Sequence, residues 1–279
     1  MVASRLGWGV SVTLASLPMY DLPETTDATC ALWHGLAQHL RAAGIPDVPD
    51  SLTGQLRLPE HWLSPGLLFS QTCGYPLTHA LRGRVRLLAT PSYDAPGCKD
   101  ASYCSIVVVP AHAPTRIFAE LRGKRAAFNS PNSHSGFNAL RALAAPLAEA
   151  GHFFIEAIET GSHAASLDLV AAGKADVAAL DCVTFALLSR YRPQAVSNVR
   201  ELCRSAPAPS LPYVTSRMAG EQRVAQLRHG LRAAMDDPAL AVARAALLLQ
   251  AVRVLPEEDY ERITKMETLA FDHGYRALG

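Results

Sequence analysis

Short apolar strands alternate with amphipathic helices along most of this chain, and this alternation restricts its possible folds more than any other feature. Such an alternation is typical of α/β proteins, in which helices cover both faces of mostly parallel sheets. The apolar runs predict strands at residues 12–17, 67–70, 85–90, 105–109, 125–129, 153–160, 176–181, 199–203 and 212–216. Apolar residues at helical spacing predict helices at 27–44, 137–149 and 162–173, and a mainly helical segment at 220–279.

The middle block of the chain, residues 94–204, contains a complete alternation of strands and helices by itself. The preceding segment, residues 10–93, has too few strands to form an independent sheet. The simplest arrangement joins residues 10–93 and 205–279 in one discontinuous domain and makes residues 94–204 a second domain, with two chain crossings as a hinge. A length of 279 residues suits two such domains, and ligands in folds of this class bind in a cleft at the carboxyl ends of the strands.

The charge balance argues against a nucleic-acid partner, because the net charge is +1 and no basic run is present. No segment approaches the roughly 18 consecutive apolar residues of a membrane span. The first 16 residues contain one cation, Arg5, and their broken apolar segment continues into the first predicted strand. This pattern is not typical of a signal peptide. We therefore expect a cytoplasmic protein, or a periplasmic one if a leader precedes this sequence.

The six cysteines include no Cys-x-x-Cys pair, and their spacing does not indicate a metal site. A chain of this length with 49% hydrophobic residues can build stable cores without disulfides. We therefore expect buried free thiols and no bound metal, with Cys73 and Cys98 as the pair to test for a bridge.

The most informative segment is residues 130–136, Ser-Pro-Asn-Ser-His-Ser-Gly, between a predicted strand and a predicted helix. The first turn of a helix presents free backbone N–H groups and the positive end of the helix dipole. The hydroxyl groups of Ser133 and Ser135 add donors that can turn toward an anion, and Gly136 permits a close approach to the backbone. These features predict an anion site at the helix start. The alternative is that Ser133 or Ser135 only caps the helix.

A second polar junction of the same kind lies at residues 160–163, Thr-Gly-Ser-His. His163, in the first turn of the following helix, can donate a hydrogen bond to an anion, or it can be an ordinary surface histidine. Because both junctions follow strands of the same block, they are expected at one edge of one sheet, which favours a shared oxyanion site. Asp181 ends another strand of this block and can act as a base or cap the next helix.

The sequence contains none of the common enzyme motifs, such as His-Glu-x-x-His, Gly-x-Ser-x-Gly, the phosphate-loop lysine motif or Gly-x-Gly-x-x-Gly. Ser133 and His134 are neighbours in the sequence, which does not place the imidazole as a base for that serine. We therefore predict a binding protein with no catalytic residues and no cofactor.

Three motifs in this order resemble the periplasmic phosphonate- and phosphite-binding proteins of ABC importers. They are residues 132–137 (Asn-Ser-His-Ser-Gly-Phe), 161–167 (Gly-Ser-His-Ala-Ala-Ser-Leu) and 173–178 (Gly-Lys-Ala-Asp-Val-Ala), and the resemblance covers most of the chain, from about residue 14 to 216. It implies the type II periplasmic-binding fold, in which two α/β domains close on the ligand.

The resemblance also implies the ligand-binding residues. In this family a serine-rich helix start and the histidine of the second junction hold the oxygen atoms of the ligand, and two tyrosines line the cleft. Where the family usually has threonine this chain has His134; if that imidazole contacts the anion as a cation, affinity should rise as the pH falls from about 8 to 6. The only nearby acid for an aminoalkyl tail is Asp181. The implied ligand-binding residues are Tyr20, Tyr103, Ser133, His134, Ser135, Gly136, His163 and Asp181.

Together these features predict a monomeric solute-binding protein that captures a small tetrahedral oxyanion, such as a phosphonate, phosphite or phosphate, and works with an ABC permease. Two alternatives stay open. One is an intracellular binding or sensing protein of the same fold. The other is an enzyme resembling the pyrimidine synthases of thiamine biosynthesis.

Overall fold

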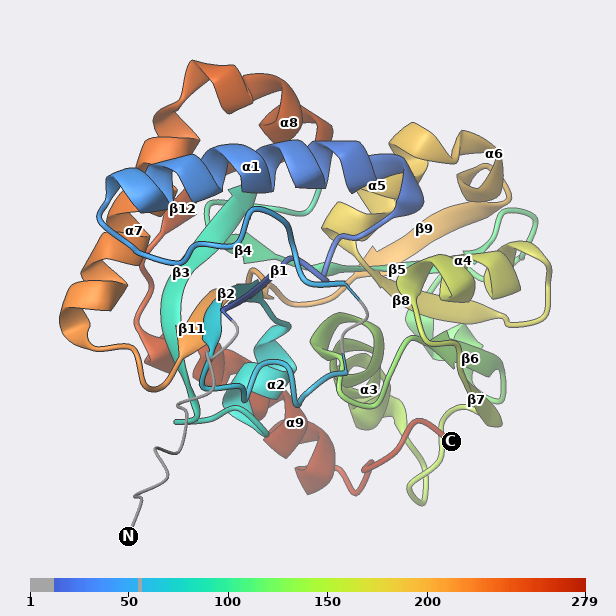
Figure 1. Cartoon of the computed structure of the whole chain (residues 1–279). Coiled ribbons are helices and arrows are strands. Elements are labelled where there is room, and N and C mark those ends of the chain that lie inside the picture. Colours follow the sequence, from blue (N-terminus) through green and yellow to red (C-terminus); the bar gives the residue numbers. More distant parts are fainter. Residues whose placement is uncertain (1–12, 55–56) are drawn as a thin grey trace, which may run out of the picture.

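The computed structural model describes residues 13–54 and 57–279, in which the alternating elements form two five-stranded sheets (Figure 1). The start of the first predicted strand, and most of the segment considered for a leader, lie outside the described residues. The first sheet has the order β1-β2-β11-β3-β12 and so combines strands from both ends of the chain. These strands are β1 (Leu14–Ser16), β2 (Leu67–Gln71), β3 (Val85–Tyr93), β11 (Tyr213–Ser216) and β12 (Leu249–Arg253).

The second sheet comes entirely from the middle of the chain and has the order β7-β6-β8-β5-β9. A small two-stranded sheet joins the two chain crossings that connect the large sheets, since β4 (Ser102–Tyr103) pairs with β10 (Ala208–Pro209). The strands of the second sheet are β5 (Ser105–Pro110), β6 (Arg125–Phe128), β7 (Glu156–Glu159), β8 (Val177–Asp181) and β9 (Val199–Arg204).

Both large sheets are mixed, which corrects the prediction of mostly parallel sheets. β1 is parallel to β2, and β6 is parallel to β7 and β8, whereas β5 and β11 are antiparallel to both of their neighbours. The crossings explain this difference. β5 and β11 enter from the other sheet, so each begins where the neighbouring strand ends: Ser105 pairs with Asp181, and Tyr213 pairs with Gln71.

Helices cover the first sheet on both faces (Figure 1). α1 (Thr26–Ala42), α7 (Glu221–Asp236) and α8 (Ala241–Ala246) lie on one side, and α2 (Gly74–Thr78) and α9 (Glu261–Asp272) lie on the other. α1 begins and ends close to its predicted bounds and buries apolar side chains at helical spacing. These are Leu32, Trp33, Leu36 and Leu40. We call the first sheet with α1, α2, α7 and α8 the first lobe.

The second sheet packs with α3 (Ala139–Ala144), α4 (His163–Ala171), α5 (Cys182–Tyr191) and α6 (Pro193–Val196). We call this assembly the second lobe. β5 and β8 are buried along their whole length, as expected for central strands covered on both faces. Because each fully buried Val or Leu contributes about 1.5–3 kcal/mol, these two strands anchor the lobe.

The end of the chain leaves the first lobe and packs on the second. Ala270 of α9, with Tyr275 and Leu278 beyond it, is buried in one apolar cluster with Leu140 of α3. Since α9 contacts both α2 and α3, it forms a third link between the lobes besides the two crossings. The division into residues 10–93 plus 205–279 and residues 94–204 remains a prediction, and this third link is a feature it did not include.

Strand β12 lies inside the segment for which the sequence predicts mainly helix. It pairs antiparallel with β3 at the edge of the first sheet. Of its five residues only Leu249 is buried. With one buried residue, β12 lacks the apolar alternation by which a strand is recognised in a sequence.

Candidate functional site

A cavity of about 780 Å³ lies between the two lobes. The first lobe contributes the segment after β1 together with α2, and the second lobe contributes the segments after β6, β7 and β8. Five of the predicted ligand-binding residues line it: Tyr20, Ser133, Ser135, His163 and Asp181. The other three, Tyr103, His134 and Gly136, are buried nearby and do not belong to its wall.

The predicted helix after β6 begins as a wide π-helical turn, residues His134–Asn138, and continues as α3. Ser133 is the N-cap of this turn, because its Oγ accepts a hydrogen bond from the backbone N–H of Gly136 at 3.1 Å. Ser133 therefore caps the turn with its oxygen, and its hydroxyl hydrogen can still donate, so its contact with a ligand remains a prediction. Turns of this kind are rare and occur often at functional sites. We call residues 130–138 the serine turn.

The two predicted junctions meet through a direct side-chain contact. Ser135 Oγ lies 2.9 Å from Nε2 of His163, the first residue of α4. Burial lowers the pKa of His163 to about 4, so the imidazole is neutral near pH 7. Its Nδ1 atom is shielded from solvent and has no hydrogen-bond partner among the described residues.

At Gly136 the serine turn packs against two segments, Asn129 directly after β6 and His163 at the start of α4. A Cβ atom at this position would overlap Asn129 Oδ1 and would lie 3.2 Å from Cε1 of His163. Asn129 Oδ1 is itself buried and lacks a hydrogen-bond partner in the described part of the chain. Asn129 was not among the residues predicted for the site, although a polar residue between a strand and the serine turn is a signal that could have identified it.

Asp181 ends β8 and caps α5, which confirms the capping alternative for this residue. Its Oδ1 accepts hydrogen bonds from the backbone N–H groups of Val183 (2.8 Å) and Thr184 (3.2 Å). Its Oδ2 accepts a hydrogen bond from the Tyr20 hydroxyl at 3.0 Å. Burial raises the pKa of Asp181 to about 6. The Tyr20–Asp181 bond therefore connects the two lobes at the cavity.

His134 and Tyr103 pack against each other, with the ring centroids 6.2 Å apart. His134 Nδ1 lies 3.2 Å from Nδ2 of Asn138, and burial lowers the pKa of this histidine to about 4. An enclosed, neutral imidazole does not support the predicted contact with an anion as a cation. Tyr103 is 1% exposed, and its hydroxyl oxygen has no hydrogen-bond partner among the residues that the structure describes.

The described wall residues include one arginine, Arg192, and no lysine. Arg192 follows α5 and forms a two-pronged ion pair with Glu24 of the first lobe, with Nε–Oε1 at 2.6 Å and Nη2–Oε2 at 3.0 Å. Both side chains are about one-third exposed (30% and 32%). This pair could not be predicted from the sequence, because the two residues are 168 positions apart and neither belongs to a motif.

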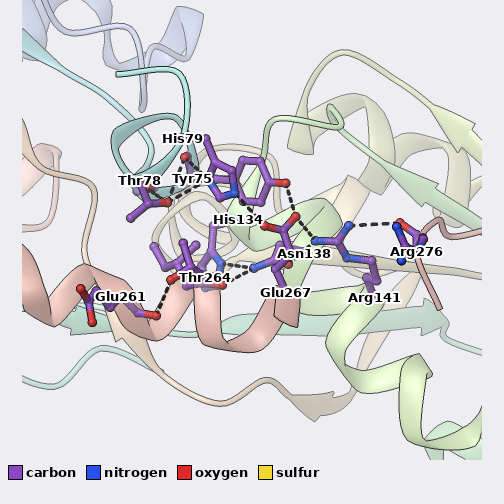
Figure 2. Close-up of polar contacts among 12 residues, drawn as sticks. Tyr75, Thr78, His79, His134, Asn138, Arg141, Glu261, Thr264, Glu267 and Arg276 are labelled. Carbon is purple, nitrogen blue, oxygen red and sulfur yellow. Dashed lines mark hydrogen bonds and ion pairs between the residues drawn. The ribbon is translucent and has the colours of Figure 1, made fainter. Parts of the chain in front are cut away.

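A second polar cluster joins the lobes through α9 (Figure 2). Glu267 Oε1 accepts hydrogen bonds from the Tyr75 hydroxyl (2.5 Å) and Arg141 Nη2 (2.8 Å), and Glu267 Oε2 lies 2.7 Å from Nε2 of His79. Arg141 also donates to Oδ1 of Asn138, the last residue of the serine turn, at 2.7 Å. We call Tyr75, His79, Asn138, Arg141 and Glu267 the Glu267 cluster. Tyr75 and His79 also line the cavity, so this cluster supports its wall from behind.

The thiols do not form the bridge considered from the sequence. Cys73 accepts a hydrogen bond from the backbone N–H of His134 at 3.4 Å, and Cys98 lies beside Cys182. All six cysteines are free.

Within residues 13–54 and 57–279, no group of three or more His, Cys, Asp or Glu is arranged to hold a metal ion. No helix in the same residues is long and apolar enough to cross a membrane.

Two mixed α/β lobes, linked by paired crossings and enclosing a cavity with polar side chains from both lobes in its wall, define a ligand-binding protein of the type II periplasmic-binding class. Residues 67–260 match the family model described as "ABC transporter, phosphonate, periplasmic substrate-binding protein". Because this match spans more than half of the chain, the chain belongs to that family, and the resemblance seen in the sequence is confirmed. Comparison with curated protein sequences finds no match.

Solved structures share the fold at low sequence identity. A binding-protein component of an ABC phosphonate transporter from Pseudomonas aeruginosa (PA3383) has a TM-score of 0.75 at 14% identity, with 94% of this chain and 87% of that chain covered. PhnD1 from Prochlorococcus marinus, in complex with methylphosphonate, has a TM-score of 0.73 at 16% identity (93% and 98% covered). XAC2383 from Xanthomonas citri, bound to ATP, has a TM-score of 0.71 at 17% identity (95% and 98% covered).

Proposed function

We propose that this protein captures a phosphonate or a related tetrahedral oxyanion where the serine turn meets α4, and that it releases the ligand unchanged to an ABC permease. The observation that carries this proposal is the unfilled bonding capacity around the Ser135–His163 contact. Asn129 Oδ1 and His163 Nδ1 are both buried without partners among the described residues. A buried polar atom without a partner costs about 1–3 kcal/mol, so a ligand that supplies the missing bonds binds favourably.

The chemistry of this group suits an oxyanion. The Ser133 hydroxyl can turn to donate, and the Asn129 amide can present its NH₂ group by turning over. The Ser135–His163 pair has two hydrogens, the serine O–H and the one N–H of the neutral imidazole. One of them joins the pair and the other can donate to the ligand, and both can donate once the ligand separates the pair. Hydrogen bonds to a charged acceptor are worth about 1.5–3 kcal/mol each. Neutral donors therefore suffice for the anion, while Glu24 neutralises the wall arginine, Arg192.

Asp181 determines whether the site can also bind an amine group on the ligand. Its carboxylate lines the cavity, but three donors already occupy it: two backbone N–H groups and the Tyr20 hydroxyl. We therefore propose a ligand without an amine, such as methylphosphonate, phosphite or phosphate, over aminoethylphosphonate.

We further propose that the lobes close on the ligand about the two crossings, with residues 10–93 plus 205–279 moving against residues 94–204. The Tyr20–Asp181 and Glu24–Arg192 contacts join the lobes at the cavity. A ligand that touches both lobes stabilises the form in which these contacts exist. Small-angle scattering should show a smaller radius of gyration at saturating ligand, and an unchanged radius would argue against closure.

The proposed ligand class is tested by thermal shift followed by titration calorimetry with phosphate, phosphite, methylphosphonate, aminoethylphosphonate, sulfate and ATP. ATP is included because XAC2383 is described with it bound. We expect one of the first three to raise the melting temperature, since a ligand at 100 times its Kd stabilises by about 2.7 kcal/mol. Phosphorus NMR should show the ligand unchanged after prolonged incubation. Stabilisation by none of the oxyanions, or by ATP alone, would contradict the proposal.

For the cellular role, we propose that the protein is a monomer and that it works in the periplasm beside a permease. The periplasmic role and the permease partner are supported by the family description. The same fold working as an intracellular sensor is the remaining alternative. Fractionation of cells that express the native gene distinguishes them, because the transport role requires the protein in the periplasmic fraction.

A further inference from the structure

Three cysteines gather where the first crossing meets the second lobe. Cys98 lies in the turn between β3 and β4, Cys104 lies between β4 and β5, and Cys182 is the first residue of α5. The Sγ atoms of Cys98 and Cys182 are 3.5 Å apart. Cys182 is fully buried, Cys104 is 7% exposed, and Cys98 is partly exposed. The binding site proposed above uses none of these thiols.

The turn that carries Cys98 is packed tightly onto the other two thiols. Gly97 has a φ of +105°, and a Cβ atom there would lie 2.8 Å from Cys104 Sγ and 3.3 Å from Cys182 Sγ. Glycine is favoured here because it adopts this backbone conformation and leaves room for the sulfur atoms. Since Cys104 Sγ and Cys182 Sγ both border Gly97, and Cys98 Sγ contacts Cys182 Sγ, the three thiols form one group around this turn.

We propose that Cys98 and Cys182 form a reversible disulfide that ties the first crossing to the start of α5. A disulfide requires an S–S distance of about 2.05 Å, so the two sulfur atoms have to approach by roughly 1.5 Å from their present contact. No backbone hydrogen bond joins residues 95–98 to the start of α5 in the described part of the chain, so the turn can make a shift of that size. Cys98 is the accessible member of the pair and Cys182 is the enclosed one, the usual arrangement of an attacking and a resolving thiol.

The chemistry needs an oxidant with a disulfide bond, such as oxidised glutathione or a disulfide-bearing oxidase of an oxidising compartment. The Cys98 thiolate attacks one sulfur of the oxidant, forms a mixed disulfide and releases one thiolate. The Cys182 thiol then loses its proton, attacks Cys98 Sγ and releases the second thiolate. The two cysteines lose two electrons and two protons in total, and the oxidant is reduced to two thiols. Cys104 stays a free thiol.

The position of this bond links it to the cavity. Cys182 directly follows Asp181, whose carboxylate bonds to Tyr20 of the first lobe, and Cys98 lies on the crossing about which the lobes are proposed to move. A disulfide in this place restrains the first crossing against the second lobe. Because the bacterial periplasm is oxidising and the cytosol is reducing, the state of the pair also depends on where the protein works.

The test uses the purified full chain treated with oxidised glutathione, alkylation of the remaining thiols, and peptide mapping by mass spectrometry without reduction. We expect a linked peptide pair that contains Cys98 and Cys182, and its loss after dithiothreitol. The bond closes a loop of 84 residues and should raise the melting temperature by about 5–10 °C. Cys98→Ser should abolish both changes, whereas Cys30→Ser, at an exposed position on α1, should retain them.

Two results would overturn the proposal: Cys98 and Cys182 unlinked after complete oxidation of the exposed Cys30, or Cys182 linked to Cys104 instead. If Cys98→Ser fails to fold, the peptide map of the oxidised wild-type protein still shows whether Cys98 and Cys182 are linked. No ligand enters this experiment, so its outcome is independent of the proposed phosphonate function.

Discussion

The serine turn has polar neighbours on two sides, and the two groups differ in how completely they are paired. On the cavity side, Asn129 Oδ1 and His163 Nδ1 lack partners among the described residues. On the side of α9, both carboxylate oxygens of Glu267 are occupied, one of them by Arg141, whose side chain is only 3% exposed. Both groups contain buried polar atoms within one small region. In the Glu267 cluster the carboxylate is fully paired and only Arg141 Nε lacks a partner among the described residues, and that atom belongs to a guanidinium already held by Glu267 and Asn138, whereas the unpaired atoms on the cavity side belong to residues that line the cavity.

This difference separates binding from stability. Filled hydrogen bonds around a buried charge hold a fold together, and removing one partner leaves the other charge uncompensated. A buried donor or acceptor without a partner destabilises the ligand-free protein, and this cost disappears when a ligand supplies the missing hydrogen bond. Substitutions in the Glu267 cluster should therefore change stability more than affinity, and substitutions at the cavity should do the reverse.

The largest expected effect is that of Glu267→Gln. Without the carboxylate, the buried Arg141 guanidinium loses its counterion, and we expect the free energy of unfolding to fall by about 3 kcal/mol. Urea denaturation measures this loss. Glu261→Gln, at the exposed start of the same helix, is the matched control and should cost less than about 1 kcal/mol. Equal losses for the two variants would contradict a structural role for the Glu267 cluster.

At the cavity, Ser135→Ala should weaken the binding of the best oxyanion by one to two decades, because one hydrogen bond to a charged ligand is worth about 1.5–3 kcal/mol. His163→Ala should have a similar effect. Stability should change little, since the ligand is the missing partner of these groups. Ser130→Ala, in the same turn but outside the Ser135–His163 contact, is the matched control for calorimetry. If Ser135→Ala and His163→Ala both bind like the wild type, the site lies elsewhere.

The buried His134 should make stability depend on pH. Its pKa is about 4 in the folded protein against about 6.5 in the unfolded chain, so the unfolded state binds more protons between these values. Stability is therefore lost as the pH falls, by about 1 kcal/mol from this group between pH 6.5 and 5.5.

Asp181 acts in the opposite direction. Its pKa is raised to about 6, so its contribution to stability increases as the pH falls through that value. The comparison must therefore be made between proteins that share Asp181. His134→Gln should show a shallower loss of stability on acidification than the wild type in urea titrations at both pH values. A parallel pH dependence in the two proteins would show that His134 is not the responsible group.

The smallest effect is expected at the rim of the cavity. Glu24→Gln removes a partly exposed ion pair with Arg192, and exposed pairs contribute little because water and salt screen them. Affinity should change by less than about fivefold, and the change should shrink in high salt. A loss as large as that of Ser135→Ala, independent of salt, would instead mean that Arg192 needs Glu24 for its correct placement on the ligand.

Much of the architecture could be predicted from the sequence because it follows from local patterns. Buried strands such as β5 and β8 are continuous apolar runs, and α1 shows a clear helical spacing. The two polar junctions were predicted to lie together, and the Ser135–His163 contact shows that they do. The direction of β5 and β11 depends on how the chain crosses between lobes, which no local pattern encodes.

The parts of the site that were missed depend on long-range contacts. Glu24 and Arg192 come from opposite lobes, and Glu267 reaches the serine turn only because α9 returns to the second lobe. The surroundings of His134 could not be predicted from the sequence for a related reason. Its neighbours in the sequence suggested a ligand contact, whereas tertiary packing against Tyr103 encloses the imidazole and keeps it neutral.

We propose that the unfilled polar group at the serine turn, and not the Glu267 cluster behind it, holds the oxyanion. The most direct measurement is a crystal structure of the complex with methylphosphonate, or with whichever oxyanion binds best. We expect phosphonate oxygen atoms within about 2.6–3.2 Å of Ser135 Oγ and of a ring nitrogen of His163, with the Glu267 hydrogen bonds intact. A ligand bound to Arg192 or to the Tyr75–His79 wall, with Ser135 and His163 unchanged, would contradict it.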